Sequence, residues 1–140
     1  DKALNYEKKF KLDKIDTFLT FEKKIQKIKK NCNTKIEAIL NLKQTIHGYG
    51  ASTKGNVILQ YFNIDNKQIK FISDRNPFKN NRYTPGTKIK IISEKKSRSL
   101  KPNYYFVLPW HFKKEILIRE IKIRKKNTKF IFPLPKFSII

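Results

Sequence analysis

Apolar residues recur every three or four positions through the first third of the chain. From Asp16 onward they step by 3, 4, 3, 4, 4 and 3 residues along one series, which is Phe18, Phe21, Ile25, Ile28, Cys32, Ile36 and Ile39. This spacing predicts one face of a long α-helix over 16–42, with lysines on the opposite face and a break at Asn31 and Asn33 as an alternative. The face could lie on a membrane surface. We favour packing against a domain core or against a preceding domain.

Beyond this helix, short apolar runs alternate with amphipathic ones. The predicted strands are 45–48, 68–73, 88–93, 104–108 and 129–132, and the predicted helices are 53–62, 94–100 and 110–124. Alternating strands and helices indicate βαβ units with right-handed crossovers. The sequence therefore predicts an α/β fold, a Rossmann-like open parallel sheet with helices on both faces, preceded by the long N-terminal helix. Residues 16–140 are predicted to form this single domain and 1–15 an extension or linker.

Composition narrows the class of protein. The chain has 140 residues and no apolar run that approaches the roughly 18 to 20 residues of a membrane span. Its single cysteine, Cys32, excludes an intrachain disulfide, and no cysteine or histidine cluster has zinc-ligand spacing. Without a signal-peptide pattern, the cytoplasm is the expected location. The chain contains no methionine and begins at Asp1, so we expect a piece of a longer protein.

The net charge of +22 raises the question of nucleic-acid binding. Of the 33 basic residues, 28 are lysine and five are arginine, whereas base readout favours the planar arginine fork. Lysine, isoleucine and asparagine together supply 60 of the 140 residues, which is the composition that A/T-rich coding DNA produces. The lysines are also scattered along the chain. We therefore disfavour specific nucleic-acid binding, while the surface can still attract anionic ligands.

A glycine-rich motif follows the first predicted strand. It reads Gly48-Tyr49-Gly50-Ala51-Ser52-Thr53-Lys54-Gly55-Asn56. Glycines permit a tight turn, and the N–H groups that begin the next helix can face an anion such as a pyrophosphate or a carboxylate. The alternative is that the glycines only make the turn compact. The dinucleotide fingerprint would require its third glycine at Thr53, while Gly55 comes two residues later.

A long irregular segment, 74–87, follows the second predicted strand. Asp74 lies 24 residues after Gly50, where a dinucleotide-binding protein places its ribose contact, and Arg75 beside it could bind a phosphate. Open α/β sheets bind ligands at this carboxyl edge. A third candidate element, Trp110 with His111, begins the helix after the fourth strand. Trp110 is interpreted as a core residue or as a stacking platform, and His111 as a neutral hydrogen-bonding group.

A self-contained catalytic site is not predicted. Neither of the two histidines, His47 and His111, stands in a recognisable arrangement of nucleophile, base and orienting group, and the eleven carboxylates are dispersed. We therefore predict a domain that binds rather than reacts.

The order of the motifs resembles the C-terminal domain of the sugar C-methyltransferase family over residues 18–140. The motifs that carry the resemblance are Gly48 to Asn56, Asp74-Arg75-Asn76-Pro77 with Lys79, Tyr83-Thr84-Pro85-Gly86-Thr87, Leu108-Pro109-Trp110-His111-Phe112 with Glu115-Ile116, and Phe130-Ile131-Phe132-Pro133-Leu134-Pro135. Two departures occur, at Asn80-Asn81 and at Lys43-Gln44-Thr45. Asparagine adopts the same left-handed backbone as glycine, so the first departure is mild.

The resemblance implies a division of labour within a longer enzyme. Zinc, S-adenosylmethionine and the catalytic acid or base would lie in upstream domains, so this fragment would bind no cofactor or metal and hold no catalytic residue. Its implied partners are the nucleotide-sugar substrate, a keto-deoxysugar, and the upstream domain that binds S-adenosylmethionine. The predicted substrate contacts are Gly48, Tyr49, Gly50, Ala51, Ser52, Lys54, Gly55, Asn56, Asp74, Arg75, Asn76, Lys79, Tyr83, Pro85, Gly86, Trp110 and His111. The rival hypotheses are a stand-alone nucleotide- or dinucleotide-binding module and a basic nucleic-acid-binding domain.

Overall fold

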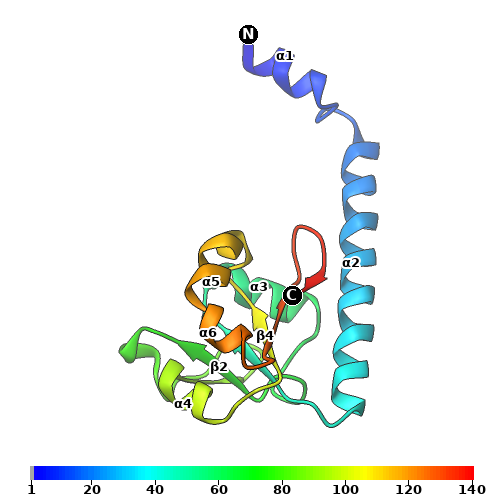
Figure 1. Cartoon of the computed structure of the whole chain (residues 1–140). Coiled ribbons are helices and arrows are strands. Elements are labelled where there is room, and N and C mark those ends of the chain that lie inside the picture. The colour runs from blue at the N-terminus through cyan, green and yellow to red at the C-terminus, as the bar shows by residue number, and fades with distance from the viewer. Residues whose placement is uncertain (1) are drawn as a thin grey trace.

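A computed structural model describes residues 2–140 as a mixed α/β fold with a six-stranded sheet in the order β3-β2-β1-β4-β5-β6 (Figure 1). The strands are β1 (Ile46–Tyr49), β2 (Phe71–Asp74), β3 (Lys90–Ser93), β4 (Tyr104–Val107), β5 (Lys129–Phe132) and β6 (Ser138–Ile139). Strands β1 to β5 are mutually parallel, and β6 pairs antiparallel with β5. The predicted open parallel sheet is confirmed, and β6 is an addition that the sequence did not predict. The strand order reverses between β1 and β4, which is where such sheets bind ligands.

The helices agree with most of the predicted ranges. They are α1 (Lys2–Lys9), α2 (Ile15–Asn41), α3 (Thr53–Tyr61), α4 (Glu94–Ser99), α5 (Lys113–Arg119) and α6 (Ile121–Arg124), with 3₁₀ turns η1 (Pro77–Lys79) and η2 (Trp110–Phe112). Helix α2 runs unbroken through Asn31 and Asn33, and the side chain of Asn33 donates a 2.9 Å hydrogen bond to the carbonyl of Phe62. The single helix predicted over 110–124 is instead divided into η2, α5 and α6.

Two hydrophobic cores cover the two faces of the sheet. Alternate side chains of a strand point to opposite faces, so neighbours such as Tyr105 and Phe106 belong to different cores. The first core packs α2 and α3 on the sheet, through residues that include Ile36, Leu59 and Phe106. The second packs α5 on the other face, around Tyr105 and Phe130. Helices therefore lie on both faces, as predicted.

Helix α3 lies unusually close to the end of β4. A Cβ atom built on Gly55 would stand 2.3 Å from the Cβ of Leu108, far inside any normal contact. Close packing of the first helix on the sheet is the task of the third glycine in the dinucleotide fingerprint. Gly55 performs this task here, although its position in the sequence is shifted.

Only the C-terminal half of the apolar face of α2 is covered. Cys32, Ile36 and Ile39 are buried, whereas Phe21 is 64% exposed and Phe18 about half exposed. In Figure 1, the N-terminal turns of α2 and the whole of α1 project beyond the domain. Helix α1 occupies the predicted extension and has no buried residue. Within residues 2–140, no helix combines the length and apolar character needed to cross a membrane.

Candidate functional site

Two hollows open at the carboxyl edge of the sheet, one on each side of the turn that follows β1. The turn begins at Gly50, whose φ of +78° is a conformation that favours glycine. We call the hollow of about 330 Å³ beside α3 the α3 hollow; its lining residues are Ala51, Ser52, Thr53, Asn56, Leu59, Lys79, Arg82, Tyr83, Thr84, Pro85, Ile91 and Leu108. We call the hollow of about 350 Å³ beside α5 the α5 hollow; it is lined by Tyr49, Gly50, Ser73, Asp74, Arg75, Glu94, Pro109, Phe112, Glu115, Ile116 and Arg119.

The α3 hollow has positively charged walls. Its charged lining residues are Lys79 and Arg82, and no carboxylate lines it within the part of the chain that the structure describes. The Arg82 guanidinium has no hydrogen bond or ion pair to residues 2–140, and Tyr83 next to it is 60% exposed. Asn56 carries a buried side-chain oxygen that has no hydrogen-bond partner among these residues. The hollow thus offers free polar groups and a positive potential to a ligand.

Most N–H groups of the glycine-rich turn are used within the protein. The donors with internal acceptors are Gly50 (to Ser73 O, 2.8 Å), Ala51 (to Asp74 Oδ2, 2.7 Å), Ser52 (to Gly50 O, 2.9 Å), Gly55 (to Ser52 Oγ, 3.0 Å) and Asn56 (to Ser52 O, 2.9 Å). These five amides are therefore not available to an anion. The amides of Thr53 and Lys54, in the first turn of α3, have no acceptor within residues 2–140 and are the ones left for an anion.

Asp74 holds the turn in place instead of presenting a free carboxylate. Its Oδ2 accepts from the amide of Ala51 (2.7 Å) and from Nζ of Lys79 (3.2 Å), and its Oδ1 accepts from the amide of Asn76 (2.8 Å). The Lys79 ammonium also donates to the carbonyl of Ala51 at 2.8 Å. The three donors occupy most of the acceptor positions of a carboxylate whose side chain is only 10% exposed, so the ribose contact considered for Asp74 is not favoured by this geometry.

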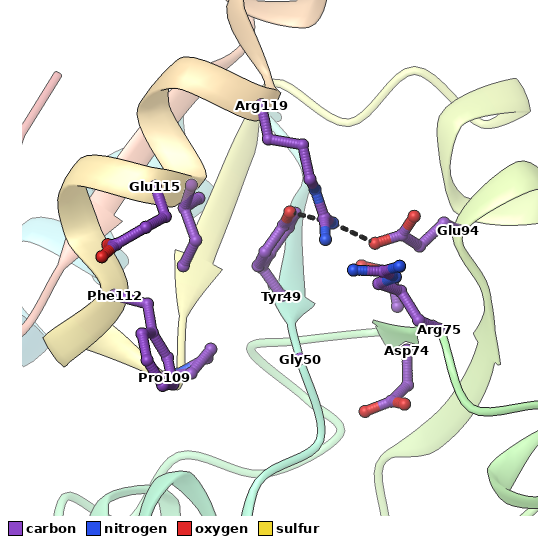
Figure 2. A pocket seen from close by; sticks show the side chains of 11 residues that line it. Tyr49, Gly50, Asp74, Arg75, Glu94, Pro109, Phe112, Glu115 and Arg119 are labelled. Carbon is purple, nitrogen blue, oxygen red and sulfur yellow. Dashed lines mark hydrogen bonds and ion pairs between the residues drawn. The ribbon is translucent and has the colours of Figure 1, made fainter.

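The α5 hollow is supported by a network of ionic and phenolic groups around the buried side chains of Tyr49 and Glu120. Tyr49 donates a 2.8 Å hydrogen bond to Glu120, which is 2% exposed. Glu120 also accepts from Arg98 and Arg119, each at 2.9 Å, and Arg119 in turn contacts Tyr49 and Glu94 (Figure 2). Burial, together with the hydrogen bond to Glu120, raises the pKa of Tyr49 well above its usual value. Tyr49 is therefore a protonated structural donor, and not a base.

Three side chains of the α5 hollow remain free for a ligand. Figure 2 shows Phe112 and Glu115 on one side and Arg75 on the opposite side, with Tyr49 and Gly50 between them; the carboxylate of Glu115 points away from Arg75 in this view. Neither Arg75 nor Glu115 has an ion pair with any residue in 2–140, and Phe112 is 52% exposed. The hollow can therefore accept hydrogen bonds, donate them and pack against an apolar surface.

The structure divides the predicted contact residues between several places. The α3 hollow receives Ala51, Ser52, Asn56, Lys79, Tyr83 and Pro85, and the α5 hollow receives Tyr49, Gly50, Asp74 and Arg75. The others line neither hollow. Gly48 and Gly55 are packed in the core, Lys54 lies exposed on α3, Asn76 caps η1, Gly86 lies in a turn beside Gln60, Trp110 packs on both cores, and His111 is exposed.

The sequence analysis predicted Asp74 and Arg75 but missed Glu94 and Arg119, which also line the α5 hollow. The carboxylates judged to be dispersed are partly brought together, because Glu94 and Glu120 share Arg98 and Arg119. The sequence contains one indication that Glu94 lies at the site: it directly follows β3, just as Asp74 ends β2, so both carboxylates come at the carboxyl edge of the sheet. No group of three His, Cys, Asp or Glu side chains among residues 2–140 is arranged to hold a metal ion.

Comparison with known proteins identifies relatives of this chain. A family model for the C-methyltransferase C-terminal domain matches residues 1–135. C-methyltransferase NovU from Streptomyces niveus is 33% identical over 97 residues, which make up 69% of this chain and 23% of that relative. The similarity therefore spans less than a quarter of the relative's length.

Proposed function

We propose that this chain, which belongs to the C-methyltransferase C-terminal domain family, is the nucleotide-sugar-binding part of an S-adenosylmethionine-dependent C-methyltransferase. The observation that carries the proposal is the α3 hollow, where Arg82 and the amide of Thr53 are unpartnered among residues 2–140, as is the amide of Lys54, which follows Thr53 in the first turn of α3. A nucleotide sugar carries a diphosphate, and cationic side chains and helix N-termini are suited to bind one. The unpartnered oxygen of Asn56 would accept a hydrogen bond from a ligand hydroxyl.

The residues of this domain would bind and orient the substrate. Arg82 and the first turn of α3 would hold the diphosphate, which lies away from the reacting carbon of the sugar. Binding energy from such a remote group can fix the position of the reacting part of a substrate. Tyr83, exposed beside Arg82, would cover the ligand.

S-adenosylmethionine and zinc are assigned to other domains of the longer enzyme, which we place in the cytoplasm. The described residues do not fit either group. Both oxygens of Asp74, the carboxylate at the end of β2, are taken by donors of the chain, and no three potential metal ligands come together within residues 2–140. When bound, S-adenosylmethionine would supply the methyl group. A dinucleotide-binding domain uses the carboxylate at the end of β2 to bind the ribose, so the hydrogen bonds that Asp74 makes within the chain also disfavour the stand-alone dinucleotide-binding alternative.

Arg82→Gln tests the assignment of the diphosphate. We expect isothermal calorimetry to show that thymidine diphosphate binds the 140-residue chain and that Arg82→Gln raises the Kd about tenfold, the loss of one charge-assisted contact. Lys35→Gln, an equal change of charge on the exposed side of α2, should leave the Kd unchanged.

Three ligands separate this proposal from its rivals. NADH and S-adenosylmethionine should not bind the chain, and a DNA duplex should not compete with thymidine diphosphate. Tight NADH binding would support the dinucleotide module. Equal effects of the Arg82 and Lys35 variants would mean that the nucleotide senses only the overall charge, which would contradict a specific site.

A further inference from the structure

We infer that the N-terminal half of α2 and the loop before β6 form a docking groove for an amphipathic helix of an acidic partner protein. The docking groove has a volume of about 420 Å³, and its apolar lining includes Phe21, Ile25 and Ile28 of α2 together with Phe137 of the loop. Figure 1 shows this loop, in red, beside the middle of α2. The docking groove shares no lining residue with the α3 hollow or the α5 hollow.

The apolar face of α2 extends beyond the part that its own domain covers. Buried Cys32, Ile36 and Ile39 pack on the first core. The same face continues towards the N-terminus through four residues that we call the α2 seam, Phe18, Phe21, Ile25 and Ile28. The first two are 51% and 64% exposed, and the last two are half-buried. A continuous exposed apolar surface of this kind marks an interaction site.

The shape of the α2 seam suits a second helix. Its residues follow one another at intervals of 3, 4 and 3 positions, which is the spacing that lets two helices interlock their side chains. From residue 18 to residue 28 the seam is about 15 Å long at 1.5 Å per residue, or three helical turns. A partner helix of that length can lie in the docking groove with its apolar face against the seam. An interface this short is typical of a weak, exchangeable complex.

The charges around the docking groove determine the chemistry of the partner. Three lysines line it, Lys24, Lys27 and Lys136, and no carboxylate does so within the described part of the chain. None of the three forms an ion pair with residues 2–140. Acidic side chains beside the apolar face of a partner helix would pair with these ammonium groups, whereas a basic helix would be repelled.

A membrane surface fits the α2 seam less well than a helix does. The seam faces the same side of α2 as Cys32, Ile36 and Ile39, which is the side on which the domain lies. Pro135 and Phe137 of the domain stand beside Ile25 and Ile28 in the docking groove. The domain therefore keeps a planar bilayer away from the seam, while a single helix can enter beside it.

A second copy of this chain is disfavoured by charge. Between residues 15 and 30, α2 carries five lysines and two carboxylates. Two such helices packed seam to seam would bring lysines of one copy against lysines of the other, and like charges at this distance repel.

Fluorescence anisotropy of the whole 140-residue chain with a labelled synthetic peptide tests the inference. The peptide is a helix of three heptads with leucine at the two seam positions and glutamate at the positions beside them. We expect it to bind at low salt with a Kd on the order of 10 µM. A peptide with the same residues in shuffled order keeps the charge but loses the apolar face, so it should bind at least about tenfold more weakly.

Variants of the chain locate the peptide. We expect Phe21→Ala and Lys24→Glu each to raise the Kd of the glutamate peptide about tenfold. Leu19→Ala and Lys30→Glu make matched changes in α2 outside the docking groove and should leave the Kd within about twofold. All four side chains are exposed, so the variants should fold, which circular dichroism can verify.

Five results would overturn the inference. Equal binding of the shuffled peptide, or equal effects of Lys24→Glu and Lys30→Glu, would mean that the peptide senses only the overall charge. Absence of peptide binding would mean that the docking groove does not accept a helix. Binding of the unmodified chain to phosphatidylserine vesicles that Phe21→Ala abolishes would assign the seam to a membrane. A dimer in sedimentation velocity that Phe21→Ala dissociates would assign the seam to a second copy.

Discussion

Gly55→Ala is expected to lower the free energy of unfolding by about 3 kcal/mol, because the added methyl group has no space. Its Cβ would lie 2.3 Å from the Cβ and 3.0 Å from the Cγ of Leu108. The Cβ of Leu108 is attached directly to the backbone, so a change of rotamer cannot move it away. Helix α3 would have to separate from β4, which outweighs the gain in helix propensity of up to about 1 kcal/mol that alanine brings. Urea unfolding of the two proteins measures the difference.

A substitution in the same helix provides the control. Val57 is 63% exposed, so Val57→Ala should change the free energy of unfolding by less than about 0.5 kcal/mol. The Gly55 variant should also bind thymidine diphosphate less well, since Leu108 and the first turn of α3 form part of the α3 hollow. A Gly55→Ala protein as stable as the unmodified chain would show that α3 and β4 are not packed as closely as described.

Acidification should destabilise the protein through His47, by up to about 3 kcal/mol. His47 is 4% exposed in β1, packs edge-on to the ring of Phe71, and its Nδ1 lies 2.8 Å from Oγ of Ser97. Burial lowers the pKa of His47 from 6.5 to about 4. The unfolded chain therefore binds a proton more readily than the folded one between these values. The stability is fully present above pH 6.5 and is lost as the pH falls towards 4.

Urea unfolding at pH 7.5 and at pH 4.5 measures this loss, with His47→Gln as the matched variant. Carboxylates also titrate near pH 4, so the result that matters is the difference between the two proteins. We expect the unmodified chain to lose about 2 to 3 kcal/mol more than the variant over this interval. If both proteins lose the same amount, His47 is not buried as a neutral side chain.

The sheet was predictable because each buried strand is a short apolar run. Strands β1 to β5 were found within three residues of their bounds, and the carboxyl edge was located by Gly50 and Asp74. The antiparallel strand β6 was missed, since it has two residues and follows a proline-rich segment. The division of 110–124 was missed as well, because an apolar spacing alone does not reveal where a helix changes direction.

The site was predictable only in outline. Motif spacing correctly brought the glycine turn and the 74–87 segment to one edge of the sheet. Motif spacing could not show that Asp74 would accept a hydrogen bond from the amide of Ala51, because that hydrogen bond depends on the relative position of two strands. The same holds for the Tyr49–Glu120 contact, which joins residues 71 positions apart. Sequence patterns identify residues near the site, while the tertiary structure decides which of them remain free.

Nuclear magnetic resonance of the ¹⁵N-labelled chain during titration with thymidine diphosphate can locate the diphosphate on the domain, because it reports on individual amides. We expect the largest shift changes at the amides of Thr53 and Lys54 and at the side-chain Nε of Arg82, with none at Asn103 and Thr128 on the opposite edge of the sheet. Changes centred on that opposite edge, or spread evenly over the lysine-rich surface, would contradict the claim that the α3 hollow holds the diphosphate.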